Sequence, residues 1–257
     1  MIILLSPAKT LDFSAPADPK SATEPQFGND AAKLIRVLKT QAPADVRRLM
    51  KLSEPLAQLN VDRYQAWRKS PDPAATREAI LAFKGDVYQG LQADQFNKRD
   101  LNYAQRRIRI LSGLYGILRP LDLMQPYRLE MGTRLENPGG KDLYAFWRQK
   151  LTRALNDDVA SRSPKAFINL ASNEYFSAID SDALAAPVIA PRFLDYNRGD
   201  YRILSFFAKK ARGAMASWLI RERVKRVADI AGFDLDGYRY CDQRSSNARP
   251  TFIRDKQ

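Results

Sequence analysis

The sequence contains no histidine and only one cysteine, Cys241. The lack of imidazole excludes Ser-His and Cys-His nucleophilic pairs, histidine-ligated haem and the common zinc and non-haem iron sites. A single cysteine excludes an internal disulfide and suits a reducing compartment. We therefore expect no metal site and no cofactor.

Long apolar runs are also missing from the sequence. No stretch of about 18 apolar residues is present, so no membrane span is expected. The N-terminal run MIILLSPAKT has no basic leader and is too short for a secretory signal. These absences predict a cytoplasmic protein with no membrane partner.

Acidic residues are outnumbered by basic ones. The 257 residues include 42 Lys and Arg against 29 Asp and Glu, which leaves a net charge of +13. Residues 202–226 alone hold eight basic side chains and one acid, Glu222. Such a balance favours a polyanionic partner, most often nucleic acid. A membrane surface fits less well, because the same segment carries the apolar residues of an ordinary core helix.

The apolar pattern predicts a mixture of helices and strands. Residues 2–5 read as a strand buried on both faces, and a helix that begins at Lys141 places Leu143, Trp147, Leu151 and Leu155 on one face. Other helices are expected at 30–40, 43–52, 61–68, from Pro73 with an interruption at 84–86, from a cap at Asp100, and at 209–230. Further strands are expected at 166–171, 188–193, 201–207, 238–241 and 251–254.

This order is not a regular alternation of strands and helices. It favours an α+β fold over a doubly wound sheet, with residues 1–257 forming one domain. In that domain a helical first part, residues 30–111, packs on a mixed sheet.

Two glycines, Gly113 and Gly116, bracket a turn in LSGLYGILRP. The pattern is similar to the hairpin of a helix-hairpin-helix DNA module, in which backbone N–H groups face a phosphate. That module has one residue between its glycines and this sequence has two. A helix C-cap followed by an ordinary turn fits the same residues.

Arginines and glutamates alternate in RLEMGTRLE, where Arg128 and Arg134 lie near Glu130 and Glu136. One interpretation is a ladder of surface ion pairs, each of which contributes little. The other is a cleft wall in which arginines hold phosphate and a carboxylate orients them. The neighbouring turns and Tyr127 favour the cleft.

Several further polar residues follow predicted strands or begin a predicted helix. Lys9 follows the first strand, and Asn173, Glu174 and Tyr175 follow the strand at 166–171, where open α/β sheets place ligands. Lys209, Lys210 and Arg212 fall at the start of the predicted helix, where the helix dipole disfavours cations. Such cations are either solvated or needed for a ligand.

The motifs IILLSPAKTLDF, LSGLYGILRPLDLMQPYRLEMGTRLEN, GKDLYAFW, INLASNEYF and SFFAKKARGAM occur in this order. Together they resemble the YaaA family of peroxide-stress proteins. The resemblance implies a mixed α/β body with a helix-hairpin-helix-like element and a positively charged cleft for duplex or branched DNA. It also implies a cytosolic role in the oxidative stress response and iron homeostasis, limiting free iron and DNA damage. The shared motifs fall at residues 6–10, 112–123, 125–132, 141–144, 169–175 and 209–213.

The leading hypothesis is therefore a DNA-binding stress protein without strong sequence preference. The expected nucleic-acid-binding residues are Lys9, Arg109, Gly113, Gly116, Arg119, Tyr127, Arg128, Arg134, Asn173, Lys209, Lys210 and Arg212. With no histidine and one cysteine, the chain lacks the groups that would reduce peroxide itself, so we expect an indirect protective role.

Two other hypotheses fit the same residues. One is an enzyme that acts on a nucleotide or a nucleic acid, with Lys and Arg as phosphate clamps and a carboxylate base. Its candidate catalytic residues are Lys9, Glu130, Asp142 and Glu174, with Arg128 in the same pocket. The other is a basic scaffold that docks acidic proteins.

Overall fold

The centre of the molecule is a five-stranded sheet with the order β6-β5-β1-β8-β9. The computed structural model describes residues 1–15, 17–18, 22–160 and 165–255. The four strands β1 (Ile2–Leu5), β5 (Ile108–Ser112), β8 (Phe167–Asn169) and β9 (Val188–Ile189) are parallel, and β6 (Gly116–Leu118) is antiparallel to β5. All four residues of β1 are buried, which confirms the predicted central strand.

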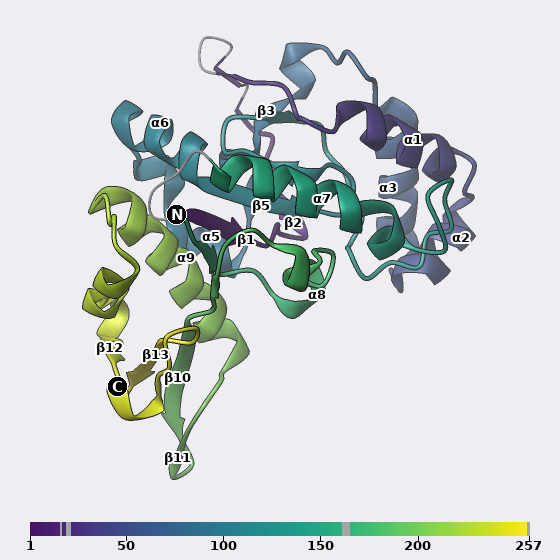
Figure 1. The fold of residues 1–257 in the computed structure, drawn as a ribbon. Coiled ribbons are helices and arrows are strands. Elements are labelled where there is room, and N and C mark those ends of the chain that lie inside the picture. Colours follow the sequence, from purple (N-terminus) through teal and green to yellow (C-terminus); the bar gives the residue numbers. More distant parts are fainter. Residues whose placement is uncertain (16, 19–21, 161–164, 256–257) are drawn as a thin grey trace.

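Helices surround this sheet. In chain order they are α1 (Gly28–Lys39), α2 (Pro43–Met50), α3 (Glu54–Ala66), α4 (Ala79–Ala82), α5 (Asp86–Leu91), α6 (Lys98–Arg107), α7 (Leu143–Ala160), α8 (Asn173–Phe176) and α9 (Ser205–Arg221). Figure 1 shows α7 in front of the sheet, α1 to α3 at the right, and α6 and α9 at the left. The helical character of the first part of the chain is confirmed.

Helix α7 covers the hairpin formed by β5 and β6. Its predicted apolar stripe is confirmed, because Leu143, Trp147, Leu151 and Leu155 are all fully buried. The indole Nε1 of Trp147 donates a hydrogen bond to the carbonyl oxygen of Gly113 at 2.9 Å. A Cβ atom on Gly116 would lie 2.7 Å from the Trp147 ring, so only glycine fits there.

Helices α5 and α9 cross at backbone contact. A Cβ atom on Gly213 would lie 1.7 Å from the carbonyl oxygen of Val87, and one on Gly90 would lie 2.0 Å from that of Lys210. Real Cβ atoms are not found at such distances, so the crossing requires glycine on both helices.

A second sheet extends away from α1 to α3, at the bottom of Figure 1. Its order is β11 (Asp200–Arg202), β10 (Arg192–Asn197), β13 (Thr251–Arg254) and β12 (Arg239–Tyr240). The rings of Phe193, Phe233, Tyr238 and Phe252 pack together beneath it. Two short pairs complete the strands: β2 (Thr10–Leu11) with β4 (Phe83–Lys84), and β3 (Arg77–Glu78) with β7 (Leu123–Met124).

The α+β class is confirmed, but several boundaries differ from those predicted. The strand expected at 201–207 ends at Arg202, and α9 begins at Ser205 rather than at Lys209. Pro191 separates β9 from β10, where one strand was expected. Helix α6 is capped by Asn97, whose side chain accepts hydrogen bonds from the N–H groups of Arg99 and Asp100. No helix in the described part of the chain is long and apolar enough to cross a membrane.

Candidate nucleic-acid interface at the carboxyl edge of the sheet

The loops that follow β5, β1 and β8 meet at one edge, because parallel strands end on the same side of a sheet. Two of these loops are tied together by serines. The Oγ of Ser6 accepts a hydrogen bond from the backbone N–H of Ser172 at 2.8 Å and donates one to the Oγ of Ser172 at 3.3 Å. Lys9 and Glu174 follow these serines, so both lie at the edge where the sequence predicted a ligand.

Glu130 lies between two cations at this edge. Its Oε2 is 2.9 Å from the Nζ of Lys9, and its Oε1 is 3.1 Å from Nη2 of Arg128. The side chain of Lys9 is 62% exposed and that of Arg128 only 17% exposed. Lys9, Arg128 and Glu130 therefore come together as predicted, and they form a linked group rather than separate surface pairs.

A third cation of this group, Arg63 on α3, was not predicted. It is half-buried and has no ion pair within the described ranges. Burial lowers the pKa of Arg63, and the nearby charge of Arg128 lowers it further. The hydroxyl of the next residue, Tyr64, donates a hydrogen bond to the backbone oxygen of Arg128. Only the tertiary packing of α3 reveals Arg63, because its sequence neighbours are those of any surface helix.

A connection between two short helices joins this group from a segment that the sequence indicated only as an interruption. Residues 83–85 connect α4 to α5, and Gly85 has a φ of 149°, a conformation that favours glycine. The Cβ of Ala8 lies 3.3 Å from the position that a Cβ on Gly85 would take. The pairing of Thr10 with Lys84 brings this turn beside Lys9.

Helix α9 contributes cations next to the same turn. The Nζ of Lys209 lies 3.5 Å from a carboxylate oxygen of Asp86, which begins α5. Arg212, one turn later, is half-buried with no ion pair among the described residues, and burial lowers its pKa. Lys210 instead pairs with Asp236 at 3.3 Å. Since α9 begins at Ser205, none of these cations lies in its first turn, which removes the helix-dipole argument made from the sequence.

The turn at Gly113 and Gly116 is a buried β-hairpin, not a hairpin between helices. It connects β5 to the antiparallel β6, and residues 113–116 are buried. The N–H of Tyr115 donates to the Oγ of Ser112 at 2.9 Å, and a Cβ on Gly113 would lie 2.2 Å from the carbonyl oxygen of Leu129. The helix-hairpin-helix interpretation of these two glycines is therefore wrong.

Three other predicted DNA contacts already have partners within the protein. Arg109 is 4% exposed and forms a two-point ion pair with Asp158, and Arg119 holds the buried Asp122 at 2.9 Å. Tyr127 is buried and its hydroxyl shares a hydrogen bond of 2.6 Å with that of Ser112. These contacts leave them poorly placed for phosphate.

The remaining predicted residues lie near α8. The Oε1 of Glu174 accepts a hydrogen bond from the N–H of Gly132 at 3.0 Å, and the hydroxyl of Tyr144 donates to the backbone oxygen of Glu174 at 3.0 Å. The carboxylate of Asp142 accepts from the N–H of Ala145 at the start of α7, which is a structural role. Asn173 and Arg134 are exposed.

Buried tyrosines lie beneath this edge. The hydroxyl of Tyr88 donates to the backbone oxygen of Ser6 at 3.1 Å. Burial raises the pKa of Tyr175, and the charges of Glu174 and Glu130 raise it further. Burial likewise raises the pKa of Tyr127. These hydroxyls therefore stay neutral at neutral pH.

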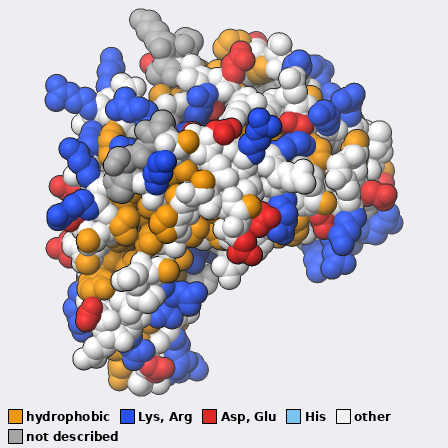
Figure 2. All heavy atoms as spheres, viewed as in Figure 1, with side chains coloured by type: hydrophobic (Ala, Val, Ile, Leu, Met, Phe, Trp, Pro, Cys, Tyr) orange, Lys and Arg blue, Asp and Glu red, His pale blue; other side chains and the backbone are white. Residues whose placement is uncertain are grey.

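Basic side chains are not confined to this edge. In the view of Figure 2, Lys and Arg are spread around the outline of the molecule, and acidic and basic side chains meet in the region of α8. Within the described part of the chain, no group of three or more Cys, Asp or Glu side chains is placed to hold a metal ion.

Comparison with known proteins identifies the family. A family model described as "Peroxide stress protein YaaA" matches residues 1–244, which include every residue of the candidate interface. The chain belongs to this family. Two relatives, from Janthinobacterium sp. (strain Marseille) and Alcanivorax borkumensis, are 49% and 48% identical to it. Each alignment covers 100% of this chain, with 99% and 100% of the relative, and both relatives are named UPF0246 protein. The family resemblance of the sequence motifs is thus confirmed, and peroxide stress is the function that the family name supports.

Proposed function

We propose that this peroxide stress protein binds DNA through the carboxyl edge of its central sheet. The observation that carries the proposal is a group of three cations, in which Lys9 and Arg128 pair with Glu130 and the half-buried Arg63 lies near Arg128. Glu130 pairs with Lys9 and Arg128 and leaves Arg63 without an acidic partner among the described residues, which favours an anion there. A half-buried guanidinium without an acidic partner is costly, and an anionic ligand would offset that cost.

The proposed interface continues onto the turn at residues 83–85. Lys84 and Lys209 are exposed there, although each pairs with a carboxylate, Asp12 at 3.6 Å and Asp86 at 3.5 Å. Surface pairs of this kind are weak, so a phosphate can compete for their cations. We infer that the connection between α4 and α5, residues 83–85, contacts the DNA backbone through the exposed Lys84.

Such an interface would contact phosphates rather than base edges. Its members are lysines and arginines from five separate segments, and phosphate contacts position a protein on DNA without reading sequence. We therefore propose binding to duplex or branched DNA with little sequence preference. Protection in the cytoplasm would come from covering DNA, and any effect on free iron would be indirect.

The test is a titration of a labelled duplex and a four-way junction at several salt concentrations. Neutralising several phosphates predicts a steep loss of affinity between about 50 and 200 mM salt. Arg63→Ala should weaken binding and lower the salt slope by about one unit. The matched control is Arg48→Ala on α2, an exposed arginine that already pairs with Asp45.

Binding that ignores salt, or an Arg63→Ala variant that binds like Arg48→Ala, would overturn the proposal. Glu130→Gln gives an independent check. Removing this carboxylate leaves the cations unneutralised, so DNA binding should become tighter.

One observation favours a second function, chemistry on a nucleotide or nucleic acid. Glu130 is fixed by Lys9 and Arg128 close to the neutral hydroxyl of Tyr175, which places a carboxylate, two cations and a hydrogen-bonding hydroxyl together. The test is incubation of labelled oligonucleotides and nucleotides with the protein and Mg²⁺, followed by product analysis. Product formation that Glu130→Gln abolishes would support it. If the substrates stay unchanged and Glu130→Gln binds DNA more tightly, DNA binding without chemistry is the function supported.

A further inference from the structure

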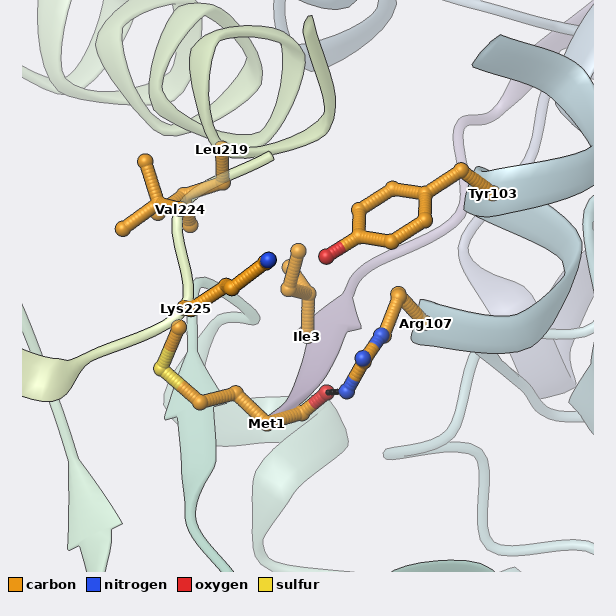
Figure 3. A pocket seen from close by; sticks show the side chains of 7 residues that line it. All are labelled: Met1, Ile3, Tyr103, Arg107, Leu219, Val224 and Lys225. Carbon is orange, nitrogen blue, oxygen red and sulfur yellow. Dashed lines mark hydrogen bonds between the residues drawn. The ribbon is translucent and has the colours of Figure 1, made fainter. Parts of the chain in front are cut away.

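A cavity of about 240 Å³ lies at the opposite edge of the sheet, beside the amino end of β1. Figure 3 shows it between α6, which carries Tyr103 and Arg107, and the segment after α9, which carries Val224 and Lys225. It is smaller than the pockets that hold drug-sized ligands, so we expect its ligand to be smaller than a typical drug.

Two cations line this cavity, and no Asp or Glu is among the described residues that line it. Lys225 points into the cavity in Figure 3 and has no ion pair within the described ranges. The guanidinium of Arg107 donates one hydrogen bond to the backbone oxygen of Met1 at 3.3 Å and keeps further N–H groups for a ligand. The charge of the cavity therefore favours an anion.

Tyr103 supplies a fixed polar group between these cations. Its ring is held by two guanidinium groups, that of Arg107 at 5.2 Å and that of Arg223 at 4.6 Å from the ring centre. Arg223 is itself fixed by Asp100 at 2.7 Å. The hydroxyl of Tyr103 points into the cavity and has no hydrogen-bond partner among the described residues. Because its ring is held in place and its hydroxyl faces the cavity, Tyr103 is positioned to donate a hydrogen bond to a ligand.

The other wall of the cavity is apolar. Ile3 and Leu219 are 4% and 2% exposed, and Val224 lies beside them. A bare inorganic ion would leave this wall without a partner. An anion with an apolar body would fill it and gain the free energy of burying apolar surface.

We propose that this cavity binds a small organic anion. Lys225, Arg107 and the hydroxyl of Tyr103 hold its phosphate or carboxylate head, and its apolar body lies against Ile3, Leu219 and Val224. The cavity shares no residue with the proposed DNA interface, so neither site depends on the other for its test.

The experiment uses the full chain and phenyl phosphate as the probe, with binding measured by calorimetry and by saturation-transfer NMR at constant ionic strength. Benzoate tests a carboxylate head, inorganic phosphate the head alone and benzyl alcohol the body alone. Phenyl phosphate or benzoate should bind saturably, and at least about tenfold more tightly than inorganic phosphate or benzyl alcohol. Lys225→Ala should weaken that binding about tenfold or more.

The matched control is Arg226→Ala, which removes the next cation along the chain. Arg226 is exposed, pairs with Asp229 at 2.5 Å and does not line the cavity, so its loss should leave binding unchanged. Equal thermal unfolding midpoints would show that both variants are folded. The proposal is overturned if neither aryl anion binds with a dissociation constant below ~10 mM, since a larger constant means very weak affinity. It is also overturned if both variants lose affinity equally, or if either the head or the body alone binds as tightly.

Discussion

Two turns in this protein contain positions that require glycine, and one of these turns is buried whereas the other is exposed. The turn at Gly113 and Gly116 has the more conspicuous sequence, yet it is enclosed by α7 and by the carbonyl oxygen of Leu129. The turn at residues 83–85 attracts little notice in the sequence, yet it stands at the carboxyl edge beside Lys9 and Lys209.

The difference shows that a glycine motif reports a backbone requirement and not an exposed site. Gly116 is needed because Trp147 occupies the space where its side chain would be. Gly85 is needed because its φ of 149° begins α5 in an open turn. The partners that surround each glycine come from distant segments, and they determine whether the turn serves the core or a ligand.

The largest expected effect comes from adding a methyl group to the buried turn. Gly113→Ala places a Cβ 2.2 Å from a backbone oxygen that cannot move without shifting the buried segment around Leu129. We expect a loss of about 4 kcal/mol or more in the free energy of unfolding, measured by denaturant titration. Gly28→Ala is the control, since nothing lies within 4 Å of its new Cβ. Equal stability of both variants would show that the buried turn tolerates side chains.

The next effect is a pH dependence of the buried turn. Burial raises the pKa of Tyr115 from 10.0 to about 12, against hydrogen bonds from Gln125 and Trp67 that lower it. Because the unfolded chain loses this proton first, the stabilisation is complete below pH 10 and is lost as pH rises from about 10 to 12, by up to about 3 kcal/mol. Unfolding measured across this range should show the fall, and Tyr115→Phe should show a shallower one. Parallel curves for the two proteins would contradict the assignment.

A smaller effect is expected at the exposed turn, on binding and not on stability. Lys84→Ala, Lys209→Ala and Arg128→Ala should each weaken DNA binding across all sequences by about tenfold or less and lower the salt slope by about one unit. Lys84 and Lys209 are exposed, so those two changes should alter the free energy of unfolding by less than about 0.5 kcal/mol. Fluorescence anisotropy on two unrelated duplexes measures binding. Wild-type affinity in both Lys84→Ala and Lys209→Ala would remove this turn from the interface.

The smallest effect is expected from Lys210→Ala. This lysine is adjacent to Lys209 but pairs with Asp236, whereas Lys209 pairs with Asp86 next to the 83–85 turn. Its loss should leave duplex affinity within about twofold of wild type, apart from the long-range effect of one charge. If Lys210→Ala weakens binding as much as Lys209→Ala, net charge and not position controls the interaction.

Much of the fold was predictable because local pattern and burial agree. The continuous apolar run of β1 indicates a strand buried on both faces. On α7, the helical spacing of Leu143, Trp147, Leu151 and Leu155 indicates one buried face, and all of these residues are buried. The pairing of Lys9, Arg128 and Glu130 was also expected, since two of the three lie close in sequence.

The rest of the site depends on packing between distant segments. Arg63 reaches Arg128 only because α3 packs beside the segment that carries it, and Lys209 reaches the 83–85 turn only through the crossing of α5 and α9. Arg109 was expected at the surface because arginines usually are, but Asp158, 49 residues later, holds it in the core. Sequence spacing contains no information on such partners.

The crossing of α5 and α9 also limits how this protein can change over generations. Each glycine, Gly90 or Gly213, faces the backbone of the opposite helix and not its side chains. No second substitution on the partner helix can therefore make room for a side chain, since a backbone oxygen is present whatever residue carries it. Any descendant that keeps this crossing must keep both glycines, whereas one that loses either must first separate the two helices. Lys209 is adjacent to that contact, so separating the helices would also move Lys209 away from Asp86 and the 83–85 turn.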